Sequence, residues 1–388
     1  MELKEFDWLS DKDSKIVIYG TTVGGKIIFQ CLQAVGVNAT FFCDRNGKYL
    51  EFCGIPVKQP SILGEEKNCK ILIATTRSFN SVCQYLDEIG QGKVYSCINL
   101  IKIRSIEDIL CDENERALVE DFYEKYPVYA GIMKNEIMFP SLEVFITERC
   151  TLKCRDCSHL IPRYLKPIDY EIDEIIDDLE KVLKVVGKIS DLIILGGEPL
   201  LHKQLYRILE WGYQQEKIGT MTIISNGTVN INEDLLNVME KTKARIRLSN
   251  YGHYSVKLKN ILCKCKERNI ACYVNDELWT DMGAIYNHNY SEKELKAVYK
   301  DCPFAYAFLM IRGKVFRCAH VAHLNNLGII DSYDYDSVDI KEITDEKIDE
   351  KKKELQKYMQ IDYLQGCNYC NGIKNSIQGI EPAIQGVR

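Results

Sequence analysis

The sequence predicts an α/β protein in which two alternating series of strands and helices precede a cysteine-containing C-terminal region. Short apolar runs alternate with helical apolar spacing at the start of the chain, and the alternation resumes near residue 141. The rhythm fades after about residue 285, where cysteines return. A chain of 388 residues is long enough for two or three domains.

The first series predicts a parallel sheet over residues 1–103. A helical pattern over residues 21–36 separates the first two apolar runs, and the predicted strands are 15–20, 38–44, 69–76 and 93–100. Strands that alternate with helices are typical of parallel sheets with right-handed crossovers. Residues 104–140 are charged and helical in pattern, so we expect them to form a linker.

The second series predicts a full or partial β/α barrel over residues 141–290. Its predicted strands are 142–147, 191–197, 221–227 and 244–250, and its predicted helices are 171–186, 205–215 and 233–242. In the first of these helices the apolar residues fall on one face, as an amphipathic helix requires. In such barrels the loops after the strands form the working face.

Composition excludes several classes of function. The formal net charge is −6 and the chain has no long basic tract, so nucleic acid is not expected as a partner. It has no apolar run of about 18 residues and no charged-then-apolar leader, so we expect a cytoplasmic protein without a membrane partner. Seventeen cysteines are an odd count and a high one. In a reducing compartment this favours metal or cofactor binding over disulfides. Cys31, Cys43, Cys69 and Cys97 have apolar neighbours and are expected in the core.

Three cysteines follow the strand 142–147 at C-x3-C-x2-C spacing: Cys150, Cys154 and Cys157. Core packing, disulfides, zinc and an iron–sulfur cluster are the possible explanations. Three thiolates on one loop can bind three irons of a cubane and leave the fourth iron open to another ligand. Polar or glycine-rich turns also end the next strands, namely Gly196-Gly197-Glu198-Pro199, Ser225-Asn226 and Ser249-Asn250.

These motifs, in this order, resemble the radical S-adenosylmethionine (SAM) superfamily, and the resemblance covers residues 141–388. It implies a partial (β/α)6 barrel, a [4Fe–4S] cluster on the three cysteines, and SAM bound by the turn residues just given. It also implies a 5′-deoxyadenosyl radical that removes hydrogen from an unactivated carbon. One departure is Asp156, which stands where many members carry an aromatic residue before the third cysteine; this bears on the adenine contact.

A second cysteine set lies at residues 291–388. Cys302 and Cys318 flank a predicted hairpin over 303–317, and Cys367 and Cys370 form a C-x2-C pair. Spacing alone allows zinc or an iron–sulfur cluster. The layout resembles the twitch domain, the short relative of the SPASM domain, which implies one auxiliary [4Fe–4S] cluster. The closest likeness is to twitch-type aminocyclitol dehydrogenases, which oxidise a secondary alcohol to a ketone.

Further candidate residues rest on their place in the chain. Arg245, Arg247, Tyr251 and His253, near one strand end, are candidate catalytic groups by location. Trp279 and Asp281 are candidate substrate contacts. His320 and His323 are expected to be surface or structural residues, with a substrate contact as the alternative.

The N-terminal turn has its own candidates: Gly20, Thr22, Gly24 and Asp44. Thr22 replaces the second glycine of a dinucleotide fingerprint, which disfavours NAD. The stretch Gly54–Val57 after the second strand resembles the Rossmann-like domain that precedes bacterial sugar-modifying acyltransferases. This implies a site for a nucleotide-linked sugar at the helix N-terminus. A structural or partner-docking role is the alternative.

The leading hypothesis is a radical SAM oxidoreductase that oxidises a carbohydrate, cyclitol or nucleotide sugar. A flavodoxin- or ferredoxin-type protein is the expected electron donor. One alternative is an epimerase, with Cys263, Cys265 or Cys272 as nominal hydrogen donors, although their apolar helical context favours the core. A peptide-modifying radical SAM maturase and a non-catalytic iron–sulfur or zinc scaffold are further alternatives.

Overall fold

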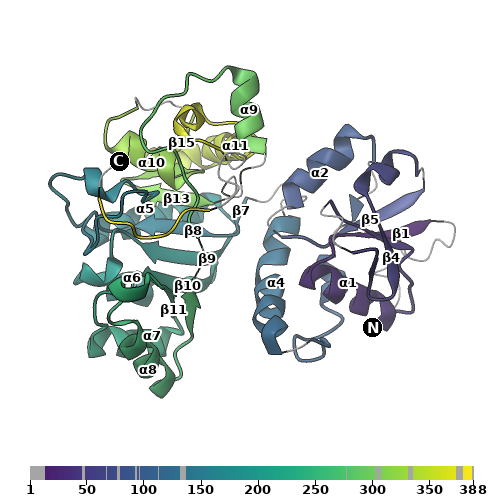
Figure 1. Cartoon of the computed structure of the whole chain (residues 1–388), viewed down its shortest axis with the longest axis horizontal. Coiled ribbons are helices and arrows are strands. Elements are labelled where there is room, and N and C mark those ends of the chain that lie inside the picture. The colour runs from purple at the N-terminus through teal and green to yellow at the C-terminus, as the bar shows by residue number, and fades with distance from the viewer. Residues whose placement is uncertain are drawn as a thin grey trace. The chain divides into compact units, whose positions relative to one another are not determined.

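The computed structural model describes two compact units, Met1–Glu136 and Ile137–Arg388. The described residues are 14–45, 49–66, 68–76, 79–91, 94–95, 97–111, 113–131, 137–276, 278–300, 302, 304, 307–330, 335–372 and 379–386. Both units combine helices with mainly parallel sheets (Figure 1), so the predicted α/β class is confirmed. In the described part of the chain, no helix is both long and apolar enough to cross a bilayer.

The first unit is a Rossmann-like sheet with strand order β3-β4-β2-β1-β5-β6. The central strand β1 pairs in parallel with β2 on one side and β5 on the other. Its elements are β1 (Lys15–Tyr19), α1 (Val23–Ala34), β2 (Phe41–Cys43), β3 (Glu51–Phe52), β4 (Ile55–Lys58), β5 (Cys69–Ile73), α2 (Phe79–Glu88), β6 (Val94–Tyr95), α3 (Ile98–Ile101) and α4 (Glu113–Gly131). The four cysteines expected in this core are buried there.

Helix α4 corrects the expectation of a linker over residues 104–140. Within it the structure describes a helix over Glu113–Gly131, and this helix packs against α1, α2 and α3. Tyr126 is fully buried, and its hydroxyl donates to the carbonyl of Ile73 at 2.9 Å and accepts from the amide of Cys97 at 3.2 Å. Aromatic residues on one helix face therefore make α4 part of the first unit's core, which a pattern of surface charges did not reveal.

The second unit contains five parallel strands in sequence order, β8-β9-β10-β11-β12. The barrel is partial, as expected, with five strands of this series rather than six in the described residues. The strands are β8 (Leu142–Phe145), β9 (Lys188–Leu195), β10 (Ile218–Ser225), β11 (Arg245–Ser249) and β12 (Cys272–Asn275). Between them run α5 (Ile172–Val185), α6 (Leu205–Gly212), α7 (Glu233–Thr242) and α8 (Leu258–Glu267), which are visible beside the strands in Figure 1. The short strand β7 (Met138–Phe139) pairs with β9.

The C-terminal strands extend the same sheet. Strand β13 (Phe308–Ile311) is parallel to β8, while β14 (Lys314–Phe316) and β15 (Ser337–Asp339) continue in antiparallel fashion. The predicted hairpin is present, and its two turn residues Arg312 and Gly313 have φ of 49° and 74°, the geometry of a type I′ turn. Helices α9 (Glu292–Lys300), α10 (Ala319–Asn326) and α11 (Ile348–Met359) belong to the same unit. The auxiliary region is thus built onto the barrel sheet, which brings the two cysteine sets into one unit.

Candidate functional site

The three cysteines of the first set line one cavity at the C-terminal ends of the barrel strands. Cys150, Cys154 and Cys157 lie on the loop after β8, and the cavity has a volume of about 180 Å³. Burial raises the pKa of Cys150 to about 12 and that of Cys154 to about 11. Such thiols stay protonated near neutral pH until a metal displaces the proton.

The glycine pair after β9 fits closely under the cysteine loop. Gly197 donates to the carbonyl of Thr147 at 2.8 Å, and a Cβ at Gly197 would lie 2.4 Å from the carbonyl oxygen of Arg149. Gly196 and Gly197 both line the cavity. Glu198 is turned away from it and is fully buried. Its carboxylate accepts from the amides of Asn226 (2.8 Å) and Leu200 (3.1 Å), so it ties the glycine turn to the end of β10.

Polar residues at the ends of β10 and β11 complete the upper wall. Ser225, Asn226 and Ser249 line the cavity, and the Asn226 amide donates to the sulfur of Cys150 at 3.5 Å. Asn250 lies elsewhere, since its amide donates to Asp276 at 2.6 Å and its oxygen accepts from Gly252. Pro199 begins a short 3-10 helix and is not in the cavity lining. Three of the eight expected SAM contacts, Glu198, Pro199 and Asn250, therefore lie outside the lining, and the other five face the cavity.

The candidate catalytic residues separate into two groups. Arg247 and Tyr251 line the cavity, as does Trp279, whose ring meets that of Tyr251 edge-on at 5.4 Å. Burial, together with the nearby cysteines, raises the pKa of Tyr251 to about 12. His253 is exposed and packs against Tyr254 with 3.9 Å between ring centroids, so the structure does not place it in the cavity lining.

Two residues that the sequence reasoning missed also line this cavity, Glu143 and His159. Glu143 is an acid within the apolar strand β8, at a position that faces the barrel interior. Burial raises the pKa of Glu143 to about 7 although the charge of Arg247 acts in the opposite direction. A carboxylate alternating with apolar residues in a barrel strand is the sequence signal that could have found it.

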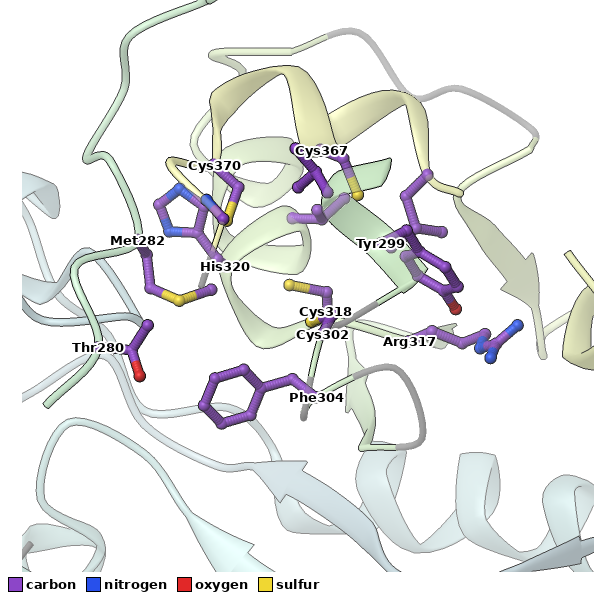
Figure 2. Close-up of a pocket in the computed structure, with 14 residues that line it drawn as sticks. Thr280, Met282, Tyr299, Cys302, Phe304, Arg317, Cys318, His320, Cys367 and Cys370 are labelled. Carbon is purple, nitrogen blue, oxygen red and sulfur yellow. The ribbon is translucent and has the colours of Figure 1, made fainter. Parts of the chain in front are cut away.

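The second cysteine set converges on a separate, smaller cavity (Figure 2). Cys302, Cys318, Cys367 and Cys370 all line it, and its volume is about 30 Å³. The four residues come from three chain segments: the end of α9, the start of α10 and the loop around Gln365–Tyr369. Burial raises the pKa of the Cys318 and Cys367 thiols, and the neighbouring cysteines raise both further. The charges of the four sulfurs are therefore close enough to interact.

The two cysteine sets are not arranged as a binding site for a single metal ion. Among the described residues, no three His, Cys, Asp or Glu side chains converge closely enough to hold one metal ion. A cubane does not need that convergence, because each thiolate binds a different iron atom. The residues present therefore suit two clusters in their donor chemistry: three thiols beside a larger cavity with several polar residues, and four around a smaller one.

Three buried histidines lie between the two cavities. His159 lines the first cavity and His320 the second, and the His159 ring meets that of His323 at 5.0 Å. His323 is fully buried, with Nδ1 2.7 Å from the Tyr164 hydroxyl. His320 and His323 are buried on α10, so of the two expected positions, surface or structural, the structure shows the structural one.

The segment after β12 connects both sites. Trp279 lines the first cavity, while Thr280 and Met282 line the second. Asp281 accepts from the amide of Gly283 at 3.0 Å, and its charge raises the pKa of the Cys370 thiol. Asp281 therefore belongs to the surroundings of the second cysteine set.

The C-terminal segment Gly379–Gly386 returns to the first cysteine loop (Figure 1). Ile380 pairs with Trp279, and Gln385 bridges to Cys154. Its side chain accepts from the amide of Lys153 at 2.7 Å and donates to the sulfur of Cys154 at 3.4 Å. Ala383 is fully buried among the three cysteines, Leu152 and Tyr251. The end of the chain is therefore part of the site.

The N-terminal candidates meet at one end of the Rossmann-like sheet. Asp44 accepts from the amide and hydroxyl of Thr21 at 2.8 and 2.7 Å, and Gly20 has φ of 119°. A Cβ at Gly24 would lie 2.2 Å from the carbonyl oxygen of Ala74, so Gly24 permits close helix-to-strand packing. The Thr22 hydroxyl lies 3.5 Å from the same carbonyl. These contacts organise the turn itself.

The nominal hydrogen donors for an epimerase lie on α8 and β12. Cys265 is fully buried and shares a side-chain hydrogen bond with Cys272, while Cys263 is exposed. Packing between a helix and its strand accounts for Cys265 and Cys272.

No family model and no curated protein matches this chain, whereas twelve chains of solved structures do. BtrN in complex with AdoMet and 2-DOIA shares 15% identity and a TM-score of 0.40, with 65% of this chain and 98% of BtrN covered. SuiB of Streptococcus suis bound to S-adenosylmethionine shares 14% identity and a TM-score of 0.24, over 63% of this chain and 75% of SuiB. HydG, a maturase of the [FeFe]-hydrogenase, shares 11% identity and a TM-score of 0.29, over 72% of this chain and 61% of HydG. All three are radical SAM enzymes, and the likeness is one of fold.

Proposed function

We propose that this protein is a radical SAM dehydrogenase that oxidises a secondary alcohol of a carbohydrate, cyclitol or nucleotide sugar to a ketone. One observation carries the proposal: two cysteine sets, of three and four residues, line two separate cavities within one unit. The three-cysteine set leaves a coordination position for a cosubstrate, while a complete four-cysteine set has thiolates for every iron of a cubane.

Residues of this chain have distinct tasks in the proposal. Cys150, Cys154 and Cys157 would hold the SAM-binding [4Fe–4S] cluster, with Gly196, Gly197, Ser225, Asn226 and Ser249 as SAM contacts. Cys302, Cys318, Cys367 and Cys370 would hold the auxiliary cluster. When bound, these groups supply a 5′-deoxyadenosyl radical for hydrogen abstraction and an acceptor for the second electron. The barrel supplies orientation and excludes water.

The test is anaerobic incubation of the reconstituted protein with SAM, a flavodoxin-type reductant and a panel of cyclitols, amino sugars and nucleotide sugars. We expect about eight irons per chain, together with 5′-deoxyadenosine and a keto product in equal amounts. An epimer that carries solvent deuterium would overturn the dehydrogenase assignment in favour of an epimerase. Zinc in place of iron would exclude both.

A further inference from the structure

Two charged residues in the lining of the first cavity, Glu143 and Arg247, are not explained by binding of the cluster or of SAM. Glu143 reaches the cavity from β8 and Arg247 from β11, on opposite sides of the partial barrel. The Arg247 guanidinium lowers the pKa of Glu143 through its charge, and no hydrogen bond is among the causes of the shift. Arg247 Nε is buried and, among the described residues, has no hydrogen-bond partner. Burying such a donor is costly unless a ligand satisfies it.

The layer beneath shows what a purely structural charge looks like in this barrel. Asp191 on β9 accepts from the hydroxyls of Thr220 and Thr222 at 3.0 and 2.8 Å, and from Arg245 at 3.0 Å. Thr220 also donates to the carbonyl of Ser190 at 3.2 Å, so Asp191 is satisfied by neighbouring side chains. Glu143 and Arg247, one layer nearer the cysteines, face an open space instead.

We propose that Glu143 is the catalytic base that takes the hydroxyl proton of the substrate, with Arg247 donating to the same oxygen. The inference rests on the proposed function and deepens it, because it defines the substrate end of the cavity as a site for a neutral polyol such as a cyclitol. Oxidation of a secondary alcohol to a ketone removes a hydrogen atom from carbon, a proton from oxygen and one electron. The proposed function assigns the hydrogen atom to the deoxyadenosyl radical and the electron to the auxiliary cluster, so the proton remains and passes to the Glu143 carboxylate.

Proton transfer at this position is suited to neutral pH. Burial raises the pKa of Glu143 to about 7, which balances basicity against the fraction that is ionised. The charged and titratable groups around it are Arg247 and Arg245 on β11, Asp191 on β9, and His159, Tyr251 and the three cysteines along the upper wall. Arg247 also favours negative charge on the substrate oxygen once the proton has left.

The test compares Glu143→Gln, which keeps the shape of the side chain, with Glu143→Asp and with the control Asp191→Asn. With a substrate deuterated at the reacting carbon, E143Q should still transfer deuterium into 5′-deoxyadenosine but form ketone at least about 100-fold more slowly. E143D should restore part of that rate. Wild-type rates should rise with pH up to about 7 and then level off, as the raised pKa of Glu143 requires, whereas E143Q should show no such rise. D191N should keep the rise but at lower pH, because the charge of Asp191 adds to burial in raising the pKa of Glu143.

A second measurement does not depend on turnover. In cluster-free protein, the infrared carbonyl band of a protonated carboxyl should titrate near pH 7 in wild type and be missing from E143Q. Suppose that wild type forms ketone. If the ketone rate of E143Q is within about threefold of the wild-type rate, or if E143Q also loses deuterium transfer, the role of Glu143 is wrong while the proposed function stands. If wild type forms no ketone from any polyol, the proposed function fails and this inference with it.

Discussion

The two cysteine cavities of the second unit differ in size, composition and position. The three-cysteine cavity has about 180 Å³ at the strand ends and includes Glu143, Arg247 and the polar ends of β10 and β11. The four-cysteine cavity has about 30 Å³ and is lined mostly by apolar side chains around its sulfurs. The first has space and polar groups beyond what its cysteines could use; the second does not. Within one unit, the cavity with more thiols has less room beside them. This difference is what the proposed function requires of a site that binds substrate and a site that only accepts an electron.

The largest effect on activity should come from changes in the three-cysteine cavity, called the open cavity below. Replacing Cys150, Cys154 and Cys157 together by alanine removes every protein ligand of the SAM-binding cluster, so iron should fall from about eight to about four per chain. 5′-Deoxyadenosine formation should fall at least about 1,000-fold, since no other group starts the reaction. Iron analysis and product chromatography measure both. Retained SAM cleavage would assign the first reaction to the other cavity and reverse the comparison.

Loss of a thiol from the four-cysteine cavity should separate cleavage of SAM, which continues, from formation of the ketone, which falls. In Cys370→Ser, weaker ligation removes the acceptor for the second electron, so 5′-deoxyadenosine should still form while ketone falls by about 10- to 100-fold. The ratio of the two products is the measurement. Cys263→Ser is the matched control, because that cysteine is exposed on α8 and should leave the ratio at one. Equal loss of both products in C370S would make the second cluster structural.

Comparing the cavities also shows what the sequence could and could not predict. The first cysteine set follows from its spacing after a barrel strand, because loops after consecutive strands meet at one barrel edge. The second set follows from the cysteines that flank a predicted hairpin and from the C-x2-C pair. The role of Glu198 did not follow: its motif suggests a ligand contact, but the folded turn buries it against the amide of Asn226. Gln385 contacts residues more than 200 positions away in the sequence, so no local pattern marks it. Glu143 carried a local signal, an acid within an apolar strand, but its neighbour Arg247 comes from a distant strand. Helix α4 was misassigned because its charges describe its exposed face, while Tyr126 decides where it packs.

A third prediction concerns stability and is opposite in sign to the effect on activity. Between about pH 4.5 and 7, Glu143 is protonated in the native protein but ionised in the unfolded chain. The free energy of unfolding therefore decreases as the pH rises through that range. E143Q removes this cost and should be more stable than wild type by about 3 kcal/mol at pH 8, with no difference below pH 4.5. Urea denaturation of cluster-free protein at the two pH values measures it. D191N should be less stable at both, since it breaks a satisfied network.

The smallest expected effect tests the contact between the chain's C-terminal segment and the open cavity. Gln385→Leu removes the amide that donates to Cys154. Hydrogen bonds to cluster sulfurs stabilise the more negative, reduced state, so the reduction potential of the SAM-binding cluster should become more negative. One hydrogen bond contributes about 1 kcal/mol, which for one electron corresponds to a shift of about 40 mV.

Redox titration followed by electron paramagnetic resonance measures this shift, and the auxiliary cluster serves as an internal reference in the same sample. Gln385→Glu is the matched variant, since it keeps the length of the side chain but loses the donor and adds negative charge, and its shift should be larger in the same direction. Unchanged potentials in both variants would mean that the hydrogen bond to Cys154 does not persist once the thiolate binds iron. The segment Gly379–Gly386 would then contribute only through the packing of Ala383. The reduction potential of the SAM-binding cluster would be set by the barrel residues alone.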